Sequence, residues 1–209
     1  MAMEGRLFAA VIAVVAASCF DFLDGFSARL LHAYSVTGKE LDSLSDEVSF
    51  GVAPGMIIFY LLSQICPSLP FGTLNAFIPY FAFVIPILSG LRLAKFNIDT
   101  RQTESFLGLP VPAHALFWAS LAYSLQPLIP IYSGVVLAVA LIVSIFLTSL
   151  LLVSEIPMFS MKVKSAGWKG NELRYILGAC GIGFIAFGGI LGIAATIFLY
   201  VLLSIFNNK

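Results

Sequence analysis

The chain has 209 residues, of which 60% are hydrophobic and only 11% are charged, and its formal net charge is zero. A mean hydropathy of +1.01 is far above that of a soluble domain, so we expect a membrane protein. A neutral chain without a basic arm gives no reason to expect a nucleic-acid partner. The three cysteines stand singly in or beside apolar runs and are interpreted as small apolar fillers.

Apolar segments long enough to suggest membrane spans follow one another along the whole chain. They cover about 7–23, 47–66, 74–91, 111–126, 131–153 and 174–206. A spanning helix needs about 20 apolar residues, and the last segment is too long for one span, so we divide it at Gly188 and Gly189. The sequence therefore predicts an all-α, polytopic membrane bundle of about seven transmembrane helices, forming one domain over 1–209.

The basic residues predict which ends of these helices face the cytoplasm. Ten of the eleven fall on the side of the connection 21–46: Arg29, Lys39, Arg92, Lys95, Arg101, Lys162, Lys164, Lys169, Arg174 and Lys209. By the positive-inside rule this side is cytoplasmic, and only Arg6 disagrees. Seven spans ending in the cytoplasm would have to begin outside, so we expect a further N-terminal helix in a longer reading frame.

Four carboxylates are concentrated in one short stretch of this apolar chain. Asp21 and Asp24 are three residues apart, and Asp42 and Asp46 are four apart. In helices each pair occupies one face, so the four acids are expected to converge. Because clustered carboxylates repel one another, a divalent cation with oxygen ligands is the expected counter-charge.

The spacing of the residues around these acids resembles a known signature. The pattern D-x-x-D-G-x-x-A-R, eight residues, then G-x-x-x-D-x-x-x-D is met by Asp21, Asp24, Gly25, Ala28, Arg29, Gly38, Asp42 and Asp46. It resembles the signature of the CDP-alcohol phosphatidyltransferase family. Three further stretches, 49–55 (SFGVAPG), 92–97 (RLAKFN) and 106–112 (FLGLPVP), are similar to the bacterial membrane-integrated phosphatidylserine synthases of that family.

The resemblance implies an enzyme that transfers a phosphatidyl group from CDP-diacylglycerol to L-serine and releases CMP. It implies one or two Mg²⁺ or Mn²⁺ ions, held by Asp21, Asp24 and Asp42, with Asp46 as the general base. It further implies an integral protein of a bacterial-type cytoplasmic (inner) membrane, among membrane lipids, with its active site facing the cytoplasm and a homodimeric assembly.

The remaining predicted site residues are assigned by substrate. The donor lipid is expected at Gly25, Ala28, Arg29 and Gly38, of which Gly38 also offers a helix-stop or turn position. The acceptor is expected at Arg92, Lys95 and Asn97, and Lys162 would hold a phosphate or a lipid headgroup. Two alternatives stay open: glycerol 3-phosphate or an inositol phosphate as the acceptor, and, from a different class, a divalent-cation transporter.

Overall fold

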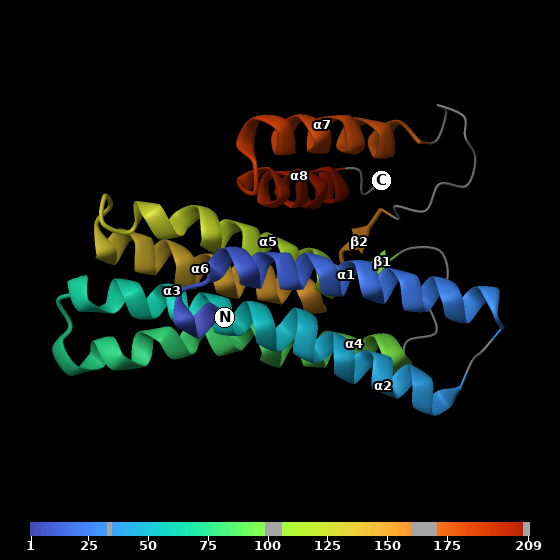
Figure 1. Ribbon diagram of the computed structural model, residues 1–209, viewed down its shortest axis with the longest axis horizontal. Coiled ribbons are helices and arrows are strands. Elements are labelled where there is room, and N and C mark those ends of the chain that lie inside the picture. The colour runs from blue at the N-terminus through green and yellow to red at the C-terminus, as the bar shows by residue number, and fades with distance from the viewer. Residues whose placement is uncertain (33–34, 99–105, 160–170, 207–209) are drawn as a thin grey trace.

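The computed structural model describes residues 1–32, 35–98, 106–159 and 171–206, and within them the chain is an almost wholly helical bundle (Figure 1). The α-helices are α1 (Leu7–Leu30), α2 (Val36–Asp46), α3 (Ala53–Ile65), α4 (Val84–Ile98), α5 (Val111–Leu125), α6 (Gly134–Val153), α7 (Glu172–Gly188) and α8 (Leu191–Phe206). Short 3₁₀ segments are η1 (Ala2–Glu4), η3 (Cys66–Ser68), η4 (Gly72–Phe83) and η5 (Gln126–Leu128), and η2 (Glu47–Val52) is a π-helix. Two-residue strands, β1 (Phe106–Leu107) and β2 (Pro157–Met158), pair antiparallel.

The predicted fold class is confirmed, but the predicted count of seven spans is not. By length and composition, four helical stretches of the described chain can cross a membrane: Leu7–Leu30, Val36–Ser68, Gly72–Ile98 and Gly134–Val153. Helices α5, α7 and α8 have 15, 17 and 16 residues, and at a rise of about 1.5 Å per residue they are shorter than a hydrocarbon core of about 30 Å.

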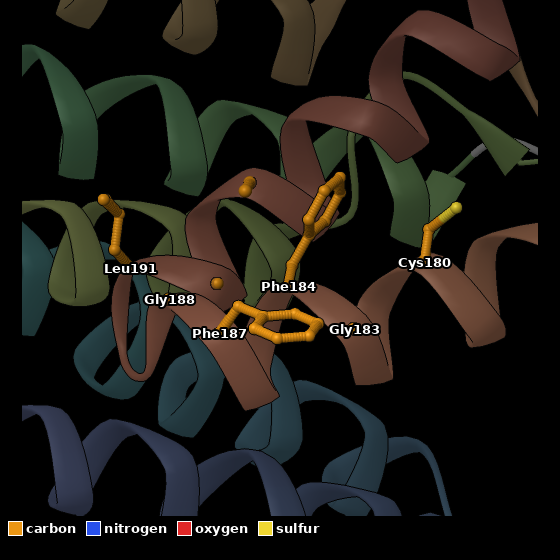
Figure 2. A pocket seen from close by; sticks show the side chains of 8 residues that line it. Cys180, Gly183, Phe184, Phe187, Gly188 and Leu191 are labelled. Carbon is orange, nitrogen blue, oxygen red and sulfur yellow. The ribbon is translucent and has the colours of Figure 1, made fainter.

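The last apolar segment is divided at the predicted place. Helix α7 ends at Gly188, and Gly189 has a φ of 56°, a left-handed conformation that glycine adopts without a steric penalty. The chain reverses there, and α8 returns along α7 (Figure 1). A pocket of about 480 Å³ lies at this end of the hairpin, lined by apolar and small residues of both helices (Figure 2).

The packed interior lies between α3 and the helices α4, α5 and α6. Ile58, Leu61 and Leu62 of α3, Trp118 of α5 and Ile145 of α6 have no exposed surface. In a lipid environment these contacts gain little from leaving water, so close van der Waals packing supplies most of their stabilisation. Helices α3, α4, α5 and α6 therefore form the packed centre of the bundle, and the remaining segments lie around them.

The helix carrying the second pair of acids continues into α3 through the π-helix η2. A π-turn adds a residue to the helical turn and re-aims the side chains that follow, and here it buries Phe50 and Gly51. Small residues are required beyond it: a Cβ on Gly55 would lie 2.9 Å from Cδ of Pro86 in α4. The stretch 49–55 therefore lets α3 approach α4 closely.

Candidate active site

Carboxylates from two helices converge where α2 passes α1. Oxygens of Asp21 from α1, and of Asp42 and Asp46 from α2, all lie within 4.8 Å of one another. Asp24 lies outside this closest group, but its carboxylate still interacts electrostatically with all three. The predicted convergence is thus present, with Asp46 nearer to Asp21 and Asp42 than Asp24 is.

These three carboxylates have the chemistry of a site for a hard divalent cation. No hydrogen bond or ion pair from the described part of the chain reaches any of the three side chains, and Arg92, which acts on Asp46, is the basic residue whose charge is felt there. Oxygens bound to one Mg²⁺ at about 2.1 Å lie at most about 4.2 Å apart. Separations of no more than 4.8 Å are close to that geometry, so Asp21, Asp42 and Asp46 fit such an ion.

The predicted donor residues of α1 lie on an open helix surface beside the acids. A Cβ added to Gly25 would meet no atom within 4 Å, so a ligand can approach the backbone there. Ala28, one turn further on, is partly exposed. The Nε of Arg29 donates to the Gly25 carbonyl at 2.9 Å, which holds this cation along the same helix edge.

Gly38 lies elsewhere than the predicted helix stop. It is in the first turn of α2, where its N–H donates to Oγ of Ser35 at 3.0 Å. Ser35 is the N-cap residue, and such a bond satisfies an N–H that the helix itself cannot pair. A Cβ on Gly38 would lie 2.8 Å from that Oγ, so glycine leaves room for the cap. The expectation of a turn was wrong because an N-cap signal preceded the glycine.

Arg92 is the predicted acceptor residue that the fold brings to the acids. Its side chain is only 8% exposed, its guanidinium lies 5.2 Å from the ring centroid of Phe96, and it interacts electrostatically with Asp46. No described residue accepts a hydrogen bond from its Nε. A buried guanidinium with an unused donor is costly unless a ligand pairs with it.

The other predicted acceptor residues point elsewhere. Nζ of Lys95 donates to the carbonyl of Val153, at the end of α6, over 3.5 Å. Nδ2 of Asn97 donates to Oγ of Ser43 in α2 at 2.9 Å. The prediction for Lys162 falls outside the described residues.

Two further side chains near the site had no clear signal in the sequence. Tyr200 of α8 is 7% exposed, donates to the Phe159 carbonyl at 3.2 Å and interacts electrostatically with Arg92. The sequence offered one indication: a tyrosine in an otherwise apolar helix usually has a hydrogen-bond partner for its hydroxyl. Oε2 of Glu47 is buried and forms no hydrogen bond with the described part of the chain, and its carboxylate lies beside Gly51 and Gly90. In the sequence, Glu47 cannot be told apart from a solvated carboxylate at the end of a span.

Fold and site together define a membrane-embedded helical bundle with a carboxylate cluster suited to divalent-metal chemistry on a charged substrate. The family model for CDP-alcohol phosphatidyltransferase matches residues 1–166. The chain belongs to the CDP-alcohol phosphatidyltransferase family, which confirms the resemblance seen in the sequence.

Relatives with assigned names show which members of the family the chain is similar to. The chain is 35% identical over 124 residues to CDP-diacylglycerol–serine O-phosphatidyltransferase of Bacillus subtilis (strain 168), covering 59% of this chain and 66% of that one. It is 35% identical over 172 residues to the enzyme of that name from Mycobacterium leprae (strain TN), covering 78% and 53%. It is 36% identical over 118 residues to archaetidylserine synthase of Methanothermobacter thermautotrophicus (strain Delta H), covering 56% and 47%. The aligned part thus spans about half to two thirds of each relative.

Proposed function

We propose that this protein transfers the phosphatidyl group of CDP-diacylglycerol to the hydroxyl of L-serine, giving phosphatidylserine and CMP. The observation that carries the proposal is the convergence of Asp21, Asp42 and Asp46 beside a buried Arg92 that interacts with Asp46. The names of the relatives, which specify serine as the acceptor, support the same substrate.

Each substrate would engage a different part of the site. The donor pyrophosphate would lie against the open face of α1 at Gly25, where the backbone is accessible, with Arg29 nearby to pair with phosphate. The carboxylate of serine would pair with Arg92, whose Nε donates to no residue of the described ranges. The two substrates would then meet at the acids that separate these positions.

Asp46 would accept the proton of the serine hydroxyl. The hydroxyl oxygen would form a bond to the phosphorus that carries the diacylglycerol, while the bond from this phosphorus to the oxygen that leaves with CMP would break. Asp46 is suited to the base role because it adjoins Arg92 on one side and the other acids on the other.

Mg²⁺ or Mn²⁺ would be held by Asp21 and Asp42, with Asp24 or Asp46 completing the set. When bound, the ion would neutralise the negative charge of the donor and stabilise the leaving phosphate. The third metal ligand is therefore either Asp24 or Asp46. Mutating each residue separately shows which of them binds the ion.

The site would face the cytoplasm of a bacterial-type inner membrane, because the basic residues gather on its side of the bundle. We further propose a homodimer. The α7–α8 pocket supports an apolar contact surface: Phe187 at its rim is 97% exposed, and Gly183 and Gly188 leave space for close approach (Figure 2).

The test is CMP release by the purified protein supplied with CDP-diacylglycerol, Mg²⁺ or Mn²⁺, and one acceptor at a time. Serine-dependent release of CMP is the expected result, with phosphatidylserine as the second product. Release of CMP with glycerol 3-phosphate or an inositol phosphate, but not with serine, would show that serine is not the acceptor. The proposed class of reaction would still hold.

A divalent-cation transporter would give a different result. It would release no CMP with any acceptor, but would move Mn²⁺ into sealed proteoliposomes. That outcome would overturn the proposed transfer reaction altogether.

A further inference from the structure

Helix α2 carries two of the converging acids, yet its own packing does little to hold it. None of the residues Val36–Asp46 is buried, and Leu41 and Leu44 are each 65% exposed. A helix without a buried stripe lacks the usual source of tertiary stability. The packed segments η2 and α3 anchor only the C-terminal end of this helix, so polar contacts must contribute to holding α2 itself, with Asp42, beside its neighbours.

Polar contacts from the end of α4 supply that connection. Nδ2 of Asn97 donates to Oγ of Ser43 at 2.9 Å and lies 3.5 Å from Oε2 of Glu40. Nζ of Lys39 donates to the Asn97 main-chain carbonyl at 3.0 Å. Asn97 thus contacts three residues of one α2 face through both its side chain and its backbone.

The donors and acceptors in this contact are arranged without conflict. Oγ of Ser43 donates its own proton to the Lys39 carbonyl at 3.2 Å, which leaves its lone pairs free to accept from Asn97. Ser43 adjoins Asp42 in the chain and precedes Asp46 by three residues. Any movement of α2 that broke the bond to Asn97 would also displace both carboxylates.

We propose that Asn97 is a positioning residue for the metal site: its amide fixes α2 against α4 so that Asp42 and Asp46 meet Asp21. This inference rests on the proposed metal site and departs from the sequence-based expectation that Asn97 binds the acceptor. Its amide hydrogens are directed to Ser43 and Glu40, so the side chain acts on the acids and not on serine.

The decisive experiment measures Mn²⁺ binding by electron paramagnetic resonance, without either substrate, in the detergent-solubilised protein. Asn97→Ala and Ser43→Ala should each weaken Mn²⁺ binding about tenfold. The double variant should be little worse than either single one, because both changes remove the same bond. Asn97→Asp loses the donors and adds a negative charge beside Oε2 of Glu40, so it should loosen α2 at least as much as Asn97→Ala.

The matched control is Asn75→Ala. Asn75 likewise donates two hydrogen bonds, to the carbonyls of Cys66 and Leu69 at 3.1 and 2.8 Å, but it ties the loop that follows α3 and contacts neither α2 nor the acids. The Asn75→Ala variant should bind Mn²⁺ as tightly as the wild type does. Hydrogen exchange over residues 36–46, measured without metal, should accelerate in Asn97→Ala but not in Asn75→Ala.

Two results overturn the inference, and they differ from each other. Unchanged Mn²⁺ binding and unchanged exchange in Asn97→Ala, with only a raised KM for serine, would return Asn97 to direct contact with the acceptor. Failure of the wild-type protein to bind Mn²⁺ would remove the proposed metal site, and with it this inference.

Discussion

The position of Asp46 suits two different roles, that of a metal ligand and that of a general base. It lies within 4.8 Å of Asp21 and Asp42, as a metal ligand would, and interacts with Arg92, as a base beside the acceptor would. A base must keep an oxygen available for the hydroxyl proton, whereas a ligand directs it to the ion. The two roles therefore predict different effects of the same mutation.

Asp46→Asn should lower kcat by about 10²–10⁴-fold, the usual contribution of a general base, while Mn²⁺ and CDP-diacylglycerol still bind. Turnover by CMP release and Mn²⁺ binding by paramagnetic resonance measure the two effects. Asp42→Asn is the comparison, because it should weaken Mn²⁺ binding itself. Loss of Mn²⁺ binding in Asp46→Asn would place Asp46 among the metal ligands.

Arg92 provides the second prediction at this scale. Arg92→Lys keeps a positive charge but loses the planar group that pairs with a carboxylate through two bonds. The KM for serine should rise about tenfold or more, whereas the KM for CDP-diacylglycerol should not change. Arg29→Lys on the donor side should show the reverse. A raised lipid KM in Arg92→Lys would assign Arg92 to the donor phosphate.

At the scale of elements, the short connection before α5 is tightly constrained at Gly108. Gly108 has a φ of 74°, its N–H donates to the Ile156 carbonyl at 2.9 Å, and the pairing of β1 with β2 lies beside it. A Cβ there would lie 2.9 Å from the Ser154 carbonyl oxygen and 3.0 Å from that of Leu151. Glycine is required both by conformation and by space.

Gly108→Ala should therefore destabilise the protein markedly. The left-handed conformation alone costs about 1–2 kcal/mol for a residue with a Cβ, and the contact with carbonyl oxygens adds to that. Thermal unfolding in detergent should show a clear fall in Tm. Gly178→Ala in α7 is the control, because a Cβ there would meet no atom within 4 Å; an equal fall in both variants would contradict this explanation.

The elements also show why the acid motif requires two helices. Asp21 and Asp24 lie in the C-terminal half of α1, and Asp42 and Asp46 at the end of α2. Ser35 caps α2, so the helix begins at a defined residue and its acids fall at a defined height beside α1. The spacing of the signature reflects this geometry.

For the whole molecule, the charge distribution predicts a fixed orientation in the membrane. Leu31 follows α1 and is 72% exposed, and Tyr132 lies between α5 and α6 and is 60% exposed. The C-terminal end of α1 and the connection from α5 to α6 lie at opposite ends of the bundle (Figure 1). Because the basic residues gather near the first, Leu31 should face the cytoplasm and Tyr132 the outside.

Single cysteines at these two positions test the orientation, in variants where Cys19, Cys66 and Cys180 are replaced by alanine. An impermeant maleimide added to intact spheroplasts should label Tyr132→Cys but not Leu31→Cys, and inside-out vesicles should give the opposite pattern. Labelling of Leu31→Cys in intact spheroplasts would reverse the proposed orientation.

The sequence by itself determined the class of fold, the place of the final helix reversal and the family. Apolar segment length, the glycine pair at 188–189 and the spacing of the acids depend on local chemistry that can be read along the chain. It also predicted that the acids converge, because helical periodicity puts each pair on one face.

Only the tertiary structure decided which groups actually meet. It placed Asp46 nearer than Asp24 to the other acids, directed Asn97 to Ser43, and brought Tyr200 of α8 to Arg92. It also gave α5, α7 and α8 lengths of 15, 17 and 16 residues, which are short for a membrane span, so the predicted count of seven spans was not confirmed. These outcomes depend on how helices distant in sequence rotate and pack against one another, and the periodicity of a single segment carries no information about its partner.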